Sequence, residues 1–181
     1  MLFPTDTLYG LGADVFSVPA LKRVFSIKGR PPDLALPVLV DGWDQVALVA
    51  RDVPESGRLL ARRFWPGALT LVLPRRDCLP DLVTGGRDTV AVRMPDHPIP
   101  LALAGKLGRP ITGTSANQSG EADPKTLAAV EAELGGQVDC IIRAGPAPEG
   151  TPSTVVDITT GTPRLLRQGA VPFPEVLLAW A

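Results

Sequence analysis

Residues that build metal sites and disulfide scaffolds are scarce in this sequence. The 181 residues include two cysteines and one histidine. Cys78 and Cys140 lie far apart, and neither stands at a metal-binding spacing from the other or from His97. This scarcity excludes the familiar types of zinc site and a disulfide-stabilised scaffold. It favours two unpaired thiols in a reducing compartment.

An excess of charge and a long apolar run are also absent. The formal net charge is −1, so any binding of nucleic acid would have to come from a local basic patch. No apolar run approaches the length that spans a bilayer, and no signal peptide is recognisable at the start. We therefore expect a cytoplasmic protein without membrane contact, folded as a single domain over residues 1–181.

Neither standard nucleotide-binding motif is present, because the chain has no Gly-Lys-Ser/Thr loop and no GxGxxG. The most informative stretch is instead FPTDTLYGLG at residues 3–12. Pro4 ends strand pairing, and Gly10 and Gly12 permit tight backbone paths. The polar side chains of residues 5–7 follow directly after a strand end, where α/β proteins bind small ligands. A polar turn without a ligand is the alternative interpretation.

Hydrophobic periodicity and the spacing of glycine and proline predict alternating strands and helices. Ser17 is the expected N-cap of the first helix, and Gly29 is its expected end. Strands are expected at residues 2–4, 36–40, 69–73, 88–94, 110–113, 138–142, 153–159 and 163–166. Helices are expected at residues 18–28, 41 or 44 to 49, 55–64, 98–107, 124–134 and 174–180. This order predicts an α/β fold with a twisted mixed sheet and flanking helices.

Polar side chains recur at the ends of these expected strands. They are Thr7, Thr89, Arg93, Ser115, Asn117, Ser153 and Arg167. Thr89 and Arg93 share one face of the strand at residues 88–94, because side chains alternate along a strand. Strand ends that converge on one crevice form the usual ligand site of an α/β protein. The sequence therefore predicts one site built from distant segments.

Lys28 and Arg30 flank a glycine at the end of the first expected helix. Two cations on one turn can hold a single anion, and polyphosphate is the natural ligand. Cations that neutralise a helix C-terminus are the alternative. Ser115 and Asn117 lie in a glycine-flanked loop that can offer a hydroxyl, an amide and backbone N–H groups to a phosphate or ribose. A simple turn is the alternative for this loop.

Six blocks that occur in order along the chain carry a family likeness. They are FPTDTLYGLG at 3–12, KGRP at 28–31, WPGALT at 65–70, VAVRMP at 90–95, TSANQSG at 114–120 and STVVD at 153–157. The chain resembles the short, single-domain form of the YrdC/Sua5 family of threonylcarbamoyl-AMP synthases, and the likeness covers essentially the whole chain. It implies a nucleotidyltransferase with a twisted mixed sheet and a concave, basic face.

The resemblance implies a reaction in which L-threonine and bicarbonate give a carbamate that attacks the α-phosphate of ATP. Pyrophosphate leaves, and threonylcarbamoyl-AMP remains for the t6A modification of tRNA. Magnesium would accompany ATP, with few protein ligands. The implied partners are downstream threonylcarbamoyl transferase proteins, with RNA contact as a further possibility.

The resemblance also implies roles for individual residues. Lys28 and Arg30 would be catalytic, holding the triphosphate and stabilising charge on the transferring phosphorus. The threonine contacts would be Thr7, Arg93 and Ser153. The nucleotide contacts would be Arg30, Thr89, Ser115, Asn117 and Arg167. No side chain is implied as a metal ligand.

The chain departs from the family pattern at three positions. Leu34 and Leu39 stand where longer members carry an asparagine and a histidine, and Asp123 stands where a serine is common. Roles of those family side chains cannot be transferred to this chain. Two other functions remain open at this point: an RNA- or nucleotide-binding module without catalysis, and a carbamoyl-AMP-forming relative that acts on carbamoyl phosphate.

Overall fold

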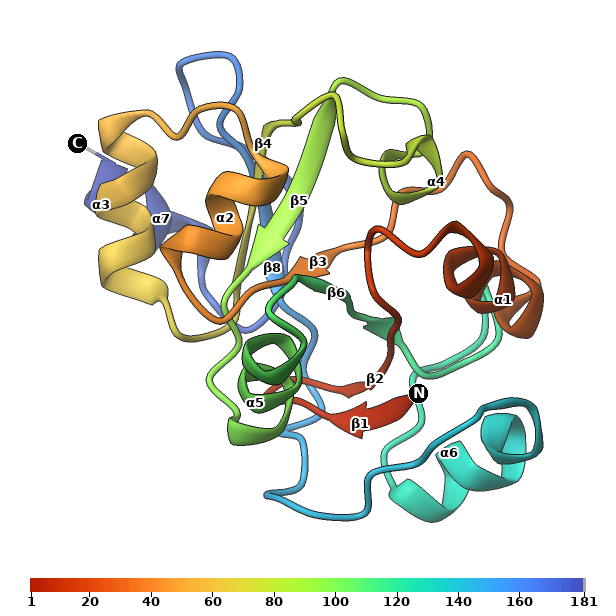
Figure 1. Cartoon of the computed structure of the whole chain (residues 1–181). Coiled ribbons are helices and arrows are strands. Elements are labelled where there is room, and N and C mark those ends of the chain that lie inside the picture. Colours follow the sequence, from red (N-terminus) through yellow and green to blue (C-terminus); the bar gives the residue numbers. More distant parts are fainter. Residues whose placement is uncertain (181) are drawn as a thin grey trace.

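Two sheets organise residues 1–180, which are the residues that the computed structural model describes (Figure 1). The smaller sheet is antiparallel, with the order β1 (Leu2–Pro4), β2 (Tyr9–Leu11) and β7 (Thr114–Ser115). β2 and β7 lie where the sequence predicts loops, so the structure corrects both assignments. Both strands are only two or three residues long, which is too short for an alternating pattern to be recognised in the sequence.

The larger sheet has six strands and is mixed, as predicted. Its order is β6 (Ile111–Thr112), β3 (Val38–Leu39), β5 (Thr89–Arg93), β4 (Leu69–Pro74), β8 (Thr154–Asp157) and β9 (Arg164–Arg167). β3 runs parallel to β5 and β4 runs parallel to β8, whereas the pairs β4–β5, β3–β6 and β8–β9 are antiparallel. Each of these strands overlaps one predicted from the sequence, although several are shorter.

The strand predicted at residues 138–142 is wrong. Ile141 forms only an isolated bridge with Leu2. Two backbone hydrogen bonds of 2.9 Å join the segment to β1, one from Leu2 N to Cys140 O and one from Ile142 N to Leu2 O. β1 has only three residues, so this pairing does not extend into a ladder. Val138 and Ile141 pack against the core, which explains the strand-like apolar pattern.

The helices begin and end close to their predicted positions. α1 (Val18–Lys28) follows Ser17 and ends at Gly29, whose φ of 56° lies in the left-handed region. The others are α2 (Trp43–Val49), α3 (Glu55–Phe64), α4 (Asp81–Thr84), α5 (Pro98–Leu107), α6 (Leu127–Leu134), the short η1 (Gly135–Gln137) and α7 (Phe173–Trp180). α4 was not predicted, and α6 begins later than expected because Thr126 caps it. Within residues 1–180, no helix has the length and apolarity needed to cross a membrane.

The helices group on different sides of the large sheet. In Figure 1, α2, α3 and α7 lie together at the left, while α1 and α4 lie at the right. α3 packs against α7, and α5 packs against β1 and β3.

β4 shows how one strand serves both the core and a cavity. Leu69, Leu71 and Leu73 are fully buried in the main apolar core. Thr70 and Val72 alternate with them on the other face of the strand and line a cavity. The large sheet thus has the core on one face and the candidate site on the other.

Candidate functional site

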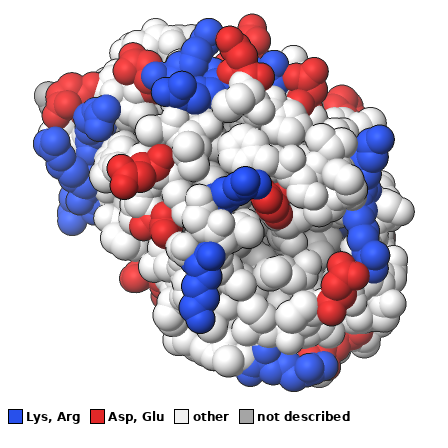
Figure 2. Space-filling model, viewed as in Figure 1, with Lys and Arg blue, Asp and Glu red and all other residues white. Residues whose placement is uncertain are grey.

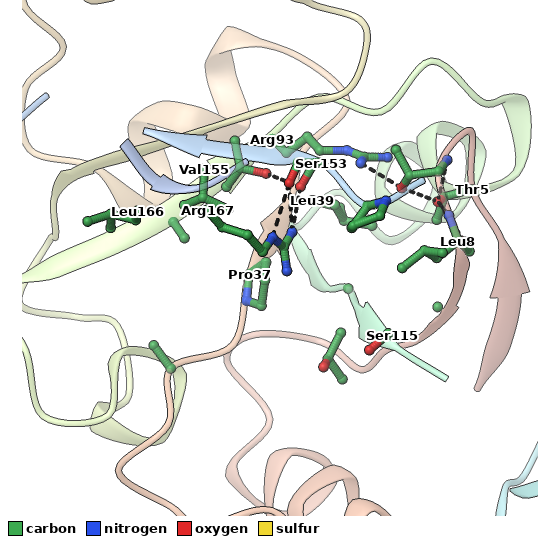
Figure 3. A pocket seen from close by; sticks show the side chains of 18 of the residues that line it. Thr5, Leu8, Pro37, Leu39, Arg93, Ser115, Ser153, Val155, Leu166 and Arg167 are labelled. Atoms are coloured by element: carbon green, nitrogen blue, oxygen red, sulfur yellow. Dashed lines mark hydrogen bonds between the residues drawn. The ribbon is translucent and has the colours of Figure 1, made fainter. Parts of the chain in front are cut away.

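A cavity of about 620 Å³ lies on the open face of the large sheet (Figure 3). Most of the predicted site residues line it: Thr7, Arg30, Thr89, Arg93, Ser115, Ser153 and Arg167. The lining also contains Arg87 and one aspartate, Asp123. Four arginines against one aspartate make the cavity suited to anionic ligands, and its volume is that of a small-molecule site.

Charged residues are distributed differently on the outer surface. Figure 2 shows one face of the molecule, on which Lys and Arg side chains are interspersed with Asp and Glu side chains. This mixture agrees with the formal net charge of −1. The concentration of cations in the cavity lining therefore contrasts with the mixed charges on the face shown.

One end of the cavity is built around Arg93. This guanidinium is only 4% exposed, donates from Nη1 to Thr7 Oγ1 at 2.8 Å, and forms an ion pair through Nη2 with Asp6. Burial lowers the pKa of Arg93, and the charge of Asp6 opposes that effect. Arg93 Nε is buried without a hydrogen-bond partner among the described residues. The fixed cation is thus only partly satisfied by the protein.

The hydroxyl of Thr7 lies beside the hydroxyl of Thr5 within the loop. The single hydroxyl hydrogen of Thr5 goes to Leu8 O at 2.7 Å. Thr5 Oγ1 also accepts from the backbone N–H groups of Thr7 and Leu8, at 3.2 and 3.1 Å, so both of its lone pairs are used and the 3.1 Å approach of the two hydroxyls does not require the hydrogen of Thr7. Thr7 Oγ1 accepts from Arg93, so it retains one lone pair for an N–H or O–H group of a ligand.

Ser153 and Arg167 lie together at another part of the cavity wall. Arg167 donates from Nε and Nη2 to Ser153 O at 3.1 and 2.9 Å, and from Nη2 to Ser153 Oγ at 3.1 Å. The Ser153 hydroxyl also lies 2.8 Å from Thr70 Oγ1. Burial lowers the pKa of Arg167, and the charge of Asp123 opposes that effect. Ser153 is therefore held at two atoms by one cation.

Arg30 and Arg87 both donate hydrogen bonds to backbone oxygens of the short loop at residues 33–35. Arg30 donates from Nε to Leu34 O at 3.2 Å and from Nη2 to Ala35 O at 2.8 Å. Arg87 donates from Nη1 to Asp33 O at 2.9 Å. Burial lowers the pKa of Arg30. Both guanidinium groups line the cavity and keep further N–H donors for an anion.

Lys28 and Asn117 do not line the cavity, unlike the other predicted site residues. Lys28 is 2% exposed, and its three ammonium hydrogens reach Ser115 O at 2.6 Å, Asn117 O at 2.6 Å and Asn117 Oδ1 at 3.0 Å. Gly29 turns the chain between Lys28 and Arg30, so the two cations do not converge. In this arrangement Lys28 and Asn117 support the loop instead of facing the space where a ligand fits.

The side chain of Asn117 completes this support. Its Oδ1 accepts from Ser115 Oγ at 2.7 Å, and its Nδ2 donates to Glu121 O at 2.7 Å. The hydroxyl of Ser115 is therefore turned toward Asn117, while Ser115 itself lines the cavity. Burial lowers the pKa of Lys28 to about 8, with a smaller contribution from the charge of Arg30.

Thr70 and Arg87 are two lining residues that sequence reasoning missed. Thr70 is the only polar residue among the apolar side chains of β4, and this position was a signal that could have been used. Arg87 lies two residues before β5 in a glycine-containing turn, where no local pattern distinguishes it from an ordinary surface arginine. Its contact with the distant Asp33 depends on tertiary structure.

Comparison with known proteins places this geometry in a family. A family model for Sua5, YciO and YrdC proteins, described as telomere recombination, matches residues 1–169. The chain belongs to the Sua5/YrdC family. Among its curated relatives, the threonylcarbamoyl-AMP synthase of Vibrio vulnificus is 38% identical over 169 residues, which cover 92% of this chain and 90% of that protein.

Longer family members are also similar to this chain. The threonylcarbamoyl-AMP synthase of Pyrococcus abyssi is 46% identical over 174 residues, covering 96% of this chain and 51% of that protein. The crystal structure of Pyrococcus abyssi Sua5 complexed with L-threonine superposes with a TM-score of 0.94 and 45% identity, over 98% of this chain and 52% of that one. The chain thus spans about half the length of these Pyrococcus relatives.

Proposed function

We propose that this cavity forms threonylcarbamoyl-AMP from ATP, L-threonine and bicarbonate. The observation that carries the proposal is one cavity of about 620 Å³ whose wall combines Arg93 and Thr7 with the separate cations Arg30, Arg87 and Arg167. Such a wall offers one place for an amino acid and others for a phosphate chain. The similar Sua5 structure in complex with L-threonine supports the amino-acid assignment.

The threonine would bind between Thr7, Arg93 and Ser153. The free lone pair of Thr7 Oγ1 can accept from the amine or the hydroxyl of threonine. The remaining N–H groups of Arg93 suit a carboxylate, because the guanidinium is planar and its position is fixed by Asp6. Ser153 lies in the wall of the same cavity and would supply a further hydroxyl.

The nucleotide would bind along Arg30, Thr89, Ser115 and Arg167, which all line the cavity. Arg30 and Arg167 carry fixed positive charge at partly buried positions, where an ion interacts more strongly than it does in water. Lys28 and Asn117 would contribute by holding the loop that contains Ser115. Their direct contact with ATP, which the resemblance implies, remains a prediction.

The reaction would proceed by positioning and electrostatic stabilisation. The amine of threonine forms a C–N bond with the carbon of bicarbonate, and water is lost. A carboxylate oxygen of the resulting carbamate attacks the α-phosphorus, a P–O bond forms, and the bond to the β-phosphate oxygen breaks. Fixed cations such as Arg30 would stabilise the charge that develops on the phosphoryl oxygens and on the departing pyrophosphate.

Magnesium would enter as the counter-ion of ATP. Among the described residues, no group of three or more His, Cys, Asp or Glu side chains is placed to hold a metal ion. Asp123 is the carboxylate in the cavity lining. Mg²⁺ commonly keeps several waters and binds through phosphates with one or two carboxylates, so this lining fits an ion that arrives with the nucleotide.

The product is a mixed anhydride of a carbamate and a phosphate, which is reactive toward water and amines. We infer that threonylcarbamoyl transferase proteins consume it in the t6A modification of tRNA. Direct contact of this chain with RNA is a further part of the proposal, and a steep salt dependence of tRNA binding would test it.

Pyrophosphate release tests the proposed reaction. Purified protein is mixed with Mg-ATP, threonine and bicarbonate, and each substrate is omitted in turn. The proposal expects release only in the complete mixture. Release that does not depend on threonine would contradict it, and carbamoyl phosphate in place of threonine and bicarbonate tests the carbamoyl-AMP alternative in the same assay.

A further inference from the structure

Thr70 is a polar side chain that lies deep in the wall of the cavity. It belongs to β4, lies beside Val155 of β8 in the parallel register, and is 1% exposed. Within residues 1–180, the only hydrogen-bond partner of the Thr70 hydroxyl is the hydroxyl of Ser153, at 2.8 Å. The proposed function gives Thr70 no role, although the residue adjoins one of the proposed threonine contacts.

The direction of this hydrogen bond follows from the groups around it. The Ser153 hydroxyl already accepts from Arg167 Nη2 at 3.1 Å. If Ser153 donated to Thr70, the hydrogen of the buried Thr70 hydroxyl would have no acceptor, and an unmade buried hydrogen bond is unfavourable. If Thr70 donates, its hydrogen is satisfied and Ser153 accepts twice. Either arrangement leaves one hydroxyl hydrogen without a protein acceptor; when Thr70 donates, it is the hydrogen of Ser153, which is 7% exposed against 1% for Thr70, so the more deeply buried hydrogen is the one that is paired.

This direction has a consequence for Ser153. A hydroxyl that accepts two hydrogen bonds has both lone pairs occupied and its own hydrogen free. Ser153 lines the cavity, so that hydrogen is available to a ligand there. Ser153 would then act only as a donor, and it would select an acceptor such as a carboxylate oxygen.

We propose that Thr70 is a positioning residue that fixes the Ser153 hydroxyl as a hydrogen-bond donor toward the carboxylate of the bound amino acid. The inference rests on the proposed function, because that function supplies the amino acid. Thr70 does not touch the ligand in this account. Arg167 supplies one of the two hydrogens that Ser153 accepts, and Thr70 supplies the other.

Direct binding of threonine, measured by calorimetry without ATP, tests this role. Thr70→Val keeps the shape of the side chain and removes its donor, so we expect the Kd of threonine to rise roughly fivefold to tenfold. Thr70→Ser keeps the hydroxyl and should bind threonine as the wild type does. Thr84→Val is a matched control, because Thr84 is a buried threonine that does not line the cavity. It should leave the Kd unchanged, whatever it does to stability.

A second arm separates positioning from a general structural effect. In the Ser153→Ala background, Thr70→Val should have little further effect on the Kd of threonine, because its target is gone. Thr70→Ala serves in the same comparison if Thr70→Val does not fold. Equal effects of the Thr70 change in both backgrounds would overturn the proposal. If the wild type binds threonine and Thr70→Val binds it with the same Kd, this proposal is overturned but the proposed function is not. If the wild type does not bind threonine, both are overturned.

Discussion

Lys28 Nζ donates to the backbone oxygens of Ser115 and Asn117 at 2.6 Å each, and so ties the end of α1 to the loop after β7. A third hydrogen bond, of 3.0 Å, reaches Asn117 Oδ1. Residues separated by more than 80 positions in the sequence are thereby held together. The buried ammonium of Lys28 therefore holds in place the segment from which Ser115 lines the cavity.

This relationship predicts different effects for two neighbouring cations. Arg30→Ala should lower kcat/KM for pyrophosphate release by about a hundredfold, the scale of one preorganised electrostatic contact, and should lower stability less than the loss of Lys28 does, because Arg30 is only partly buried. Lys28→Ala should lower both activity and the free energy of unfolding, the latter by about 1.5–3 kcal/mol, because hydrogen bonds from a buried charged group are lost. Thermal denaturation and kinetics on both variants test this. Lys22→Ala, at an exposed position of α1, is the control. Equal stability of the Lys28 and Lys22 variants would contradict the supporting role.

The pKa of Lys28 predicts a pH dependence of stability. It is about 8 in the folded protein, compared with an ordinary value of 10.5. Between these values the unfolded chain binds more protons at this residue, so the contribution of Lys28 to the free energy of unfolding rises with pH. Below the folded value, the contribution is at its lowest and is constant. Urea denaturation of the wild type and of Lys28→Met measures this. From about pH 8 to 10.5, the free energy of unfolding of the wild type should rise relative to that of Lys28→Met. If the difference between the two proteins does not change with pH, the lowered pKa of Lys28 is refuted.

The ion pair between Arg93 and Asp6 predicts that a positive charge at position 93 is not enough for threonine binding without the geometry of a guanidinium. Arg93→Lys keeps a cation but cannot reach Thr7 and Asp6 with the geometry of a guanidinium. We expect a loss in threonine affinity of about tenfold or more, with the KM of ATP changed much less. Titration with each substrate measures this, and Arg109→Lys, on an exposed side chain, is the control. A variant with unaltered threonine affinity would remove Arg93 from the amino-acid site.

Much of the framework was predictable because it depends on local patterns. The predicted bounds of α3 and α5 match the structure, since apolar spacing and flanking prolines and glycine define both helices. The central strands β4 and β5 were also predicted, because leucine and valine residues recur along β4 and valine alternates with other residues in β5. Strand ends on one side of the sheet then indicated where the site would be.

The remaining features depend on contacts that no local pattern contains. β7 exists because Ser115 pairs with Gly10, far away in the sequence. The orientation of Lys28 away from Arg30 depends on the left-handed turn at Gly29 and on carbonyl oxygens from another segment. The donor role inferred for Thr70 follows from its position beside Ser153, which lies 83 residues away in the sequence, although a polar residue in an apolar strand was a local signal of a special position.

The hydroxyl-rich wall predicts an order of amino-acid substrates. Valine has nearly the shape of threonine but lacks the hydroxyl, so it would leave buried polar groups unpaired and should be rejected by up to about 10⁴-fold. Serine lacks only a methyl group and should be roughly 10–200-fold worse than threonine. Comparing kcat/KM for the three amino acids at saturating ATP and bicarbonate checks the order. Equal use of valine and serine would mean that the cavity recognises shape alone.

The most direct test of the proposed function is identification of the product. The protein is incubated with Mg-ATP, threonine and isotopically labelled bicarbonate, and the nucleotides are separated and analysed by mass spectrometry. We predict an adenylate whose mass is that of threonylcarbamoyl-AMP and which contains the labelled carbon, together with an equal amount of pyrophosphate. Arg30→Ala should form it far more slowly. Pyrophosphate release without a labelled adenylate, or no labelled adenylate from the folded wild-type protein, would contradict the proposed function.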